Sequence, residues 1–272
     1  MLHLIRCPEH RRRKLVFYSE ETIHSVQGRQ ISEIVLSRNT RLPVSRLVRR
    51  YDLLDGTVLF SQRLGEKQIR RFCSRGVRIA EIGREKEMLQ NSFLLSAAVQ
   101  MLELADIPSA HRVLGIADPQ LRHRELIERA VQRLAQVRIW TCRLDAARQL
   151  QQYLMDEYGA PVLFGEEPEI LRCSGVILSP EDVEIPLPKV PVLTPEKPET
   201  VPEQPVVLYH PLPQMPSDCL PLLEEGEIDP MQLLGALVSS ERCWKLRTLP
   251  CESLLCSGEK ISVRQAARFV HS

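Results

Sequence analysis

The sequence predicts an α/β protein with two parallel-sheet domains, a Pro-rich linker and a small C-terminal helical tail. Short apolar runs typical of buried strands alternate with longer amphipathic stretches typical of helices, which indicates sheets covered on both faces. Twelve of the 20 prolines lie between Pro180 and Pro221, so a segment of different character follows the alternating part. The charge changes along the chain as well: residues 1–87 carry 19 Lys and Arg against 10 Asp and Glu, whereas residues 181–272 carry 8 against 14.

The N-terminal basic α/β domain is predicted to span residues 1–87. Its apolar runs are short and contain β-branched residues, and Gly76 ends the second helical stretch before another strand begins. The expected strands are Met1–Ile5, Leu15–Tyr18, Ile34–Leu36, Thr57–Phe60 and Val77–Ile82, and the expected helices are Val44–Tyr51 and Glu66–Ser74.

Residues 88–180 are predicted to form a Rossmann-like domain, because strands and helices alternate there with short connections. A long helix over Glu85–Leu104 leads into it and ends before Pro108. The expected parallel strands are Val113–Ala117, Val137–Thr141, Pro161–Phe164 and Val176–Leu178. Between them, Asp118 and Pro119 are expected to begin one helix as N-cap and first residue, and Leu144–Tyr158 is expected to form the next.

Beyond residue 180 the composition predicts no further domain. Proline recurs too often in residues 181–205 for a helix to persist, so we expect an extended linker that crosses the surface. Residues 206–272 are expected to form a small tail that packs on the body of the protein. Its predicted elements are a strand at Val206–Tyr209, an Asp-capped helix over Asp229–Val238 and a last helix over Ser262–Val270.

The composition excludes several classes of protein. No apolar run approaches the roughly 18 residues that a membrane-spanning helix needs, and the charges follow the first apolar run instead of preceding it, as they would in a secretory signal. The eight cysteines show no CxxC spacing and no cluster with histidine, so we expect reduced thiols and no metal site. These features predict a cytoplasmic protein.

The first turn of the Rossmann-like domain departs from the dinucleotide-binding pattern GxGxxG. Its register is Gly115, Ala117 and Gln120, so only the first glycine is kept. Ala117 adds a methyl group where a pyrophosphate approaches the backbone. Asp118 follows directly, and a carboxylate at a helix start accepts hydrogen bonds from the N–H groups that would otherwise bind the phosphate.

Arg143, in contrast, favours retained binding of NADP. It follows the second strand of the domain, where the acidic residue that holds a free ribose is missing and where an NADP-binding protein places a cation for the 2′-phosphate. A surface arginine near Asp145 would look the same in the sequence. We therefore expect no firmly bound cofactor, with NADP as the candidate if one is retained.

Residues of about 55–180 resemble the A subunit of bacterial dipicolinate synthase and, more distantly, two-domain proteins of the shikimate-dehydrogenase type. The similarity lies in the strand Val77–Ile82, in Asn91-Ser92 and Ser96-Ala97 at the following helix, and in Thr141–Arg143. By this resemblance Asn91, Ser92 and Ser96 would face the cleft between the domains and contact a small ligand. The resemblance also implies an NAD(P)-binding fold, a bacterial source and a connection with sporulation, although the family's glycine loop is absent.

Three functions remain open at this point. The first is a non-catalytic or ligand-binding relative of two-domain dehydrogenases, since no catalytic set emerges from the scattered histidines and serines. The second is an NADP-dependent oxidoreductase with an altered phosphate-binding loop. The third is an anion- or nucleic-acid-binding module that uses residues 1–87, although an aromatic content of 5% leaves few side chains for base stacking and argues against nucleic acid. A second copy of the chain is a further candidate partner.

Overall fold

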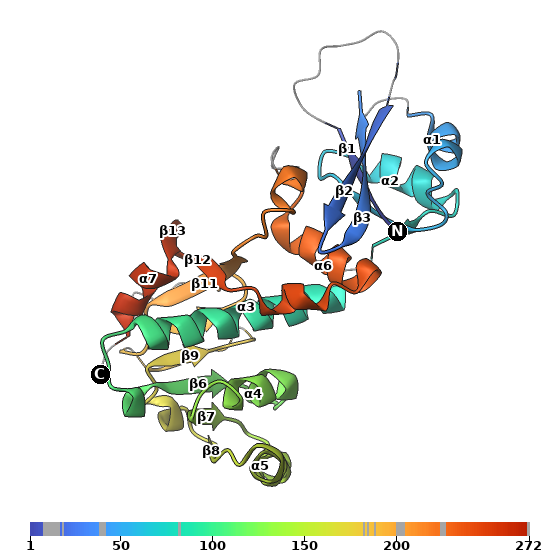
Figure 1. Ribbon diagram of the computed structural model, residues 1–272. Helices are drawn as coiled ribbons and strands as arrows, with labels where there is room; N and C mark the ends of the chain where they lie inside the picture. The colour runs from blue at the N-terminus through green and yellow to red at the C-terminus, as the bar shows by residue number, and fades with distance from the viewer. Residues whose placement is uncertain are drawn as a thin grey trace. The chain divides into compact units, whose positions relative to one another are not determined.

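The structure is a computed structural model that divides the chain into two compact units (Figure 1). The first unit comprises Met1–Leu89 and Met215–Arg247, and the second comprises Gln90–Gln214 and Thr248–Ser272. Each unit has its own sheet, and most strands in both sheets are parallel. The residues that the structure does not describe are 8–16, 18, 38–41, 81–82, 182, 184, 188, 200–204, 224–226 and 271–272.

The sheet of the first unit has five strands in the order β2-β3-β1-β4-β5. Strands β3, β1, β4 and β5 are mutually parallel, and β2 forms an antiparallel hairpin with β3 at one edge. Glycine is needed in the hairpin turn, where Gly28 has a φ of +75°. The strands are β1 (Leu2–Arg6), β2 (Ser19–Val26), β3 (Arg29–Leu36), β4 (Thr57–Phe60) and β5 (Arg78–Ile79).

Helices α1 (Val44–Arg50) and α2 (Glu66–Cys73) pack on one face of this sheet, over a core that includes Ile5 and Phe60. Helix α6 (Pro230–Glu241) contacts β1 and β4, although it lies far away in the sequence. Asp229 caps it as predicted, because the carboxylate accepts the Gln232 N–H at 3.0 Å. The 3-10 helices η3 (Leu220–Leu222) and η4 (Trp244–Thr248) flank α6 along the chain.

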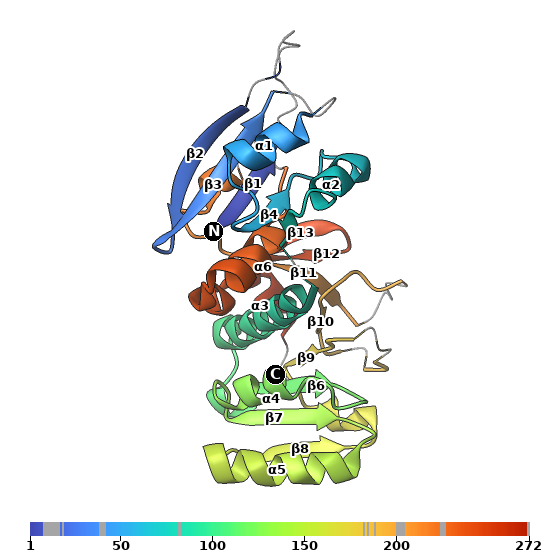
Figure 2. The ribbon, with the colours of Figure 1, turned by 90° about the vertical axis from the view of Figure 1, so that its right-hand side faces the viewer.

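The sheet of the second unit contains the strand order of a Rossmann fold. Its eight strands run β13-β12-β11-β10-β9-β6-β7-β8, and Figure 2 shows β9, β6, β7 and β8 in this sequence. Read from β8 to β11, the order is 3-2-1-4-5-6, and all six of these strands are parallel. They are β6 (Val113–Ala117), β7 (Gln136–Trp140), β8 (Val162–Gly165), β9 (Val176–Leu178), β10 (Val192–Thr194) and β11 (Val207–Pro213). The antiparallel strands β12 (Cys251–Cys256) and β13 (Glu259–Ser262) extend the sheet beyond β11.

The two faces of this sheet are covered differently. The main core contains apolar residues from α3 (Gly83–Leu104), α4 (Arg124–Val131), α5 (Leu144–Tyr158) and α7 (Val263–Ala266). A second core contains Ala117 and Ile177 from the strands together with Leu171 of η2 (Pro168–Leu171). Its remaining members come from the Pro-rich segment, and they are Ile185, Leu187, Val190 and Val192. The short 3-10 helices η1 (Ser109–His111) and η5 (Ala267–Phe269) lie elsewhere in the unit.

The Pro-rich segment is therefore not the surface linker predicted for residues 181–205. It supplies β10, which pairs with β9 on one side and β11 on the other, and its apolar residues cover one face of the sheet. A strand only three residues long needs few main-chain donors, so it tolerates prolines immediately before and after it. Among the described residues of the Pro-rich connections before and after β10 there is no helix of the kind that usually joins parallel strands.

The C-terminal residues 206–272 do not form one helical tail. Residues 206–214 continue the second sheet, Met215–Arg247 belong to the first unit, and Thr248–Ser272 return to the second. Two further predictions, one of a helix and one of a strand, can be compared with the structure. The helix expected from Pro119 begins only at Arg124, because a turn follows Asp118 and Leu121 has a φ of +54°. The strand expected at Leu15–Tyr18 lies outside the described residues, apart from Phe17.

The central position of β10 gives a test of this fold. Leu193 is fully buried in the main core, so we expect Leu193→Ala to lower the free energy of unfolding by about 2–5 kcal/mol. Lys197→Ala, an exposed change in the same segment, should stay within about 0.5 kcal/mol. Urea unfolding followed by circular dichroism measures both. Equal effects of the two changes would mean that the segment is not part of the sheet.

Candidate functional site

Each sheet has a switch point, where connections leave two neighbouring strands in opposite directions. In open α/β sheets ligands bind outside the carboxyl ends of the strands at this point. In the second unit the switch point lies between β6 and β9, and in the first unit it lies between β1 and β4. The polar side chains at these two strand edges are therefore the candidate functional groups of the chain.

Gly115 in β6 is required by packing and not by a ligand. A Cβ atom at this position would lie 2.8 Å from Ser174 Oγ and 3.1 Å from Ile177 Cγ1. The contact with Ile177 of β9 explains why this glycine is kept although the rest of the GxGxxG pattern is missing. Ala117, two residues further on, is fully buried in the second core.

Asp118 follows β6 and occupies the position of a ligand anion with its own carboxylate. The side chain is fully buried. Oδ1 accepts the Arg122 N–H at 2.9 Å, and Oδ2 accepts the His123 N–H at 2.8 Å. Both carboxylate oxygens are thus engaged by the main chain of the connection to α4. The donors are the amides of Arg122 and His123 and not those of a helix that starts at Pro119, and competition between this carboxylate and a phosphate stays a prediction.

Ionic contacts join the connection after β6 to the chain that follows β9. Arg122 Nη1 lies 3.2 Å and His123 Nε2 lies 3.6 Å from Glu181 Oε1. Ser179 Oγ donates to the main-chain oxygen of Glu181 at 2.7 Å, which fixes the turn after β9. The two strand ends at this switch point are therefore linked by charged side chains of the same unit.

The other predicted site residues have local contacts. Asn91 Nδ2 lies 3.4 Å from His123 Nδ1, and Ser92 Oγ accepts from the Arg129 guanidinium. Ser96 Oγ accepts from Gln100 Nε2 at 3.1 Å and lines a pocket of ≈ 300 Å³. The structure thus brings Asn91 and Asp118 to the same connection, whereas Ser96 lies elsewhere on α3. Their role in ligand binding stays a prediction.

Arg143 lies at the start of α5, after the carboxyl end of β7. Its side chain is exposed, and its N–H donates to Thr141 Oγ1 at 3.3 Å. An exposed cation at this strand end is compatible with the position of a 2′-phosphate and equally with an ordinary surface arginine.

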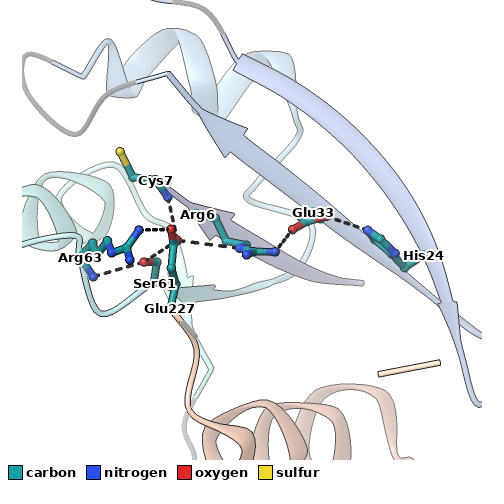
Figure 3. Close-up of polar contacts among 7 residues, drawn as sticks. All are labelled: Arg6, Cys7, His24, Glu33, Ser61, Arg63 and Glu227. Atoms are coloured by element: carbon teal, nitrogen blue, oxygen red, sulfur yellow. Dashed lines mark hydrogen bonds and ion pairs between the residues drawn. The ribbon is translucent and has the colours of Figure 1, made fainter. Parts of the chain in front are cut away.

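The switch point of the first unit holds Glu227, which the sequence analysis did not single out (Figure 3). This side chain comes from the segment before α6 and is fully buried. Oε2 accepts the Cys7 N–H at 3.3 Å, just after β1, and the Ser61 hydroxyl at 3.1 Å, just after β4. Arg63 Nη1 lies 2.6 Å from Oε1, and Arg6 Nε lies 3.8 Å from Oε2. Main-chain amide, hydroxyl and guanidinium donors converge on one carboxylate, as they would on a bound anion.

A chain of charged side chains continues from this carboxylate across the sheet (Figure 3). The Arg6 guanidinium also pairs with Glu33 of β3, whose other oxygen lies 2.7 Å from His24 Nε2 of β2. Strands β1, β2 and β3, the residues just after β4 and the segment before α6 are therefore connected through these polar side chains. Removal of one member of such a buried network leaves an uncompensated charge, so the network specifies how these elements assemble.

The remaining features that bear on function are metal-binding clusters, membrane-spanning helices and reactive thiols. Among the described residues, no group of three or more His, Cys, Asp or Glu could hold a metal ion, and no helix is long and apolar enough to cross a membrane. All eight cysteines are free. Burial raises the pKa of the Cys219 and Cys251 thiols to about 12, so both are protonated near neutral pH and are poor nucleophiles.

Comparisons with known proteins add little to this picture. No protein-family model matches the sequence, and no curated protein matches it at a significant level. Among solved structures, the chain is similar to an L-tryptophan dehydrogenase from Nostoc punctiforme, with 12% identity and a TM-score of 0.33 over 88% of this chain and 68% of that chain. The resemblance to the dipicolinate synthase A subunit gains no support here. The Rossmann-like fold follows from the strand order of the second sheet.

The buried position of Glu227 leads to a prediction. We expect Glu227→Gln to lower the free energy of unfolding by about 3–5 kcal/mol, because it removes the negative charge that faces two guanidinium groups. Chemical denaturation measures the change. Glu252→Gln is the matched control: its ion pair with Lys260 is 57% exposed on both sides, and the loss should be less than about 1 kcal/mol. Similar losses in the two variants would contradict a special role for Glu227.

Proposed function

We propose that the protein is a non-catalytic, cytoplasmic relative of two-domain dehydrogenases that acts by binding and not by dinucleotide chemistry. The observation that carries the proposal is the pair of hydrogen bonds from the Arg122 and His123 amides to the buried Asp118 carboxylate. These amides belong to the first connection of the Rossmann-like sheet, where a pyrophosphate would approach. Glu227 supports the same conclusion in the other unit, because its carboxylate occupies the donors at the first unit's switch point.

At this turn the Asp118 carboxylate would repel a bound phosphate, whereas Arg143 would attract the 2′-phosphate of NADP. Like charges separated by about 4 Å repel by about 4 kcal/mol at an effective dielectric constant of 20. A single charge-assisted contact between Arg143 and a 2′-phosphate returns only about 1.5–3 kcal/mol. The buried carboxylate of Asp118 thus outweighs the one cation that favours NADP. The methyl group of Ala117 packs inside the second core, so it contributes neither to the repulsion nor to the attraction.

The alternative is an NADP-dependent oxidoreductase with an altered loop. The exposed Arg143 at the carboxyl end of β7 favours it. In that function the dinucleotide would lie farther from the turn than in the usual pose, with the 2′-phosphate on Arg143 and no contact between pyrophosphate and the Arg122 and His123 amides.

Calorimetric titration with NADP distinguishes the two functions. We expect the native protein to bind NADP weakly or not at all. The double change Ala117→Gly with Asp118→Gly should improve the affinity, because it removes the competing carboxylate. The same change removes two hydrogen bonds, so it should lower stability by at least about 1 kcal/mol.

An Arg143→Ala variant serves as the control for the oxidoreductase alternative. If the native protein binds NADP with micromolar affinity and Arg143→Ala abolishes that binding, the non-catalytic proposal is wrong. If neither the native protein nor the glycine variant binds, Asp118 is not what prevents binding, and the explanation given above fails while the lack of dinucleotide chemistry stands.

A further inference from the structure

One face of the first unit carries a concentration of exposed positive charge. Helices α1 and α2 lie side by side on the sheet in both views (Figures 1 and 2). The two helices carry one exposed acidic side chain, Glu66 of α2, which lines the second pocket described below, and the exposed Asp52 lies two residues after α1. The exposed cationic residues are Arg46, Arg49, Arg50, Lys67, Arg70, Arg71 and Arg75.

Two adjoining pockets lie on this surface. The first, of ≈ 360 Å³, is lined by Arg46, Arg71 and Arg75 together with Ser45 and Ser74. The second, of ≈ 440 Å³, shares Arg71 and Ser74 with it and continues along α2. Arginines and serine hydroxyls are the donors that bind phosphate oxygens, and a guanidinium does so through two parallel hydrogen bonds.

The charges in the first pocket are available to a ligand. Arg71 is held in place because its Nη2 donates to the main-chain oxygen of Leu42 at 3.1 Å. Within the described part of the chain, Arg46 and Arg75 have no ion-pair partner. The one ion pair recorded on this face joins Arg70 to Glu66, and both side chains are more than three-quarters exposed, so it neutralises little of the positive field.

We propose that the α1–α2 face binds the phosphate backbone of a double-stranded nucleic acid. Two adjoining pockets that share Arg71 place cationic side chains over more surface than one small anion contacts. The cationic residues outside the first pocket, Arg49, Arg50 and Lys67 among them, extend the positive surface beyond the reach of a single phosphate group. No aromatic side chain lines either pocket, which disfavours a single strand bound by base stacking. This binding is independent of the switch points and of the proposed function.

Fluorescence anisotropy with a labelled duplex of arbitrary sequence tests the proposal. With three arginines on phosphates, we expect the logarithm of the binding constant to fall with the logarithm of salt concentration with a slope of about −2.7 or steeper. Arg46→Gln with Arg75→Gln should make the slope shallower by about 1.8 and weaken binding at low salt. The matched control is Arg172→Gln with Arg264→Gln, two exposed arginines of the second unit, and it should leave the slope unchanged.

Several outcomes would overturn the proposal. One is that the duplex does not bind at about 50 mM salt, a low-salt condition that favours phosphate contacts. Another is that the pocket variant and the control variant of the second unit weaken binding equally. Displacement of the duplex by equal charge concentrations of poly-glutamate would mean that the face prefers an acidic protein. Binding of inorganic phosphate without any binding of duplex would limit the pocket to a small ligand. Thermal denaturation of the two double variants should agree with that of the native protein, which shows that folding is retained.

Discussion

The carboxylate of Glu227 links segments that are more than 160 residues apart in the chain. It meets the ends of β1 and β4 at the point where their connections diverge, and Arg6 and Arg63 neutralise its charge. Because a buried carboxylate is costly unless it is paired, the segment from Met215 to Arg247 has one favourable position on the first sheet. The pairing of Glu227 and the buried apolar residues of α6 together hold the returning chain against β1 and β4.

The second unit also has a buried carboxylate at the carboxyl ends of its strands, Asp118, which accepts hydrogen bonds from the main chain. Its six parallel strands have the Rossmann order, the described residues of the Pro-rich connections around β10 form no helix, and the Asp118 carboxylate after β6 accepts two main-chain N–H groups. An internal carboxylate makes the same hydrogen bonds as a ligand without the entropy that association costs. Both sheets thus keep the geometry of a ligand-binding fold while the donors at their switch points stabilise the protein itself. A fold does not imply a function, so the role of these points depends on their side chains, which in both units are buried carboxylates bound by donors of the same unit.

Strands and helices with strong periodicity were predictable from the sequence, and so was a carboxylate at Asp118 that accepts main-chain N–H groups after β6, although the helix that it was expected to cap begins only at Arg124. The role of residues 181–205 was not, because proline content indicates an extended chain but does not show whether that chain enters a sheet. Glu227 was missed because its partners Cys7 and Ser61 are distant in sequence and nothing local marks it. The available signal was charge inside apolar strands: Arg6 ends the run Leu2–Ile5, and Glu33 interrupts Ile31–Leu36. Charges at such positions require partners, and those partners lie on other elements.

The central claim is that the first switch point is an anion site occupied by the chain's own carboxylate. Chemical rescue of Glu227→Ala tests it most directly, because this change leaves the Cys7 amide, the Ser61 hydroxyl and two guanidiniums around a space of carboxylate size. We predict that acetate or formate raises the melting temperature of Glu227→Ala well beyond the effect of equal sodium chloride, by up to about 2.7 kcal/mol of stability at a hundred times the dissociation constant. Neither the native protein nor Glu252→Ala should respond in this way. Identical responses of all three proteins would contradict the claim.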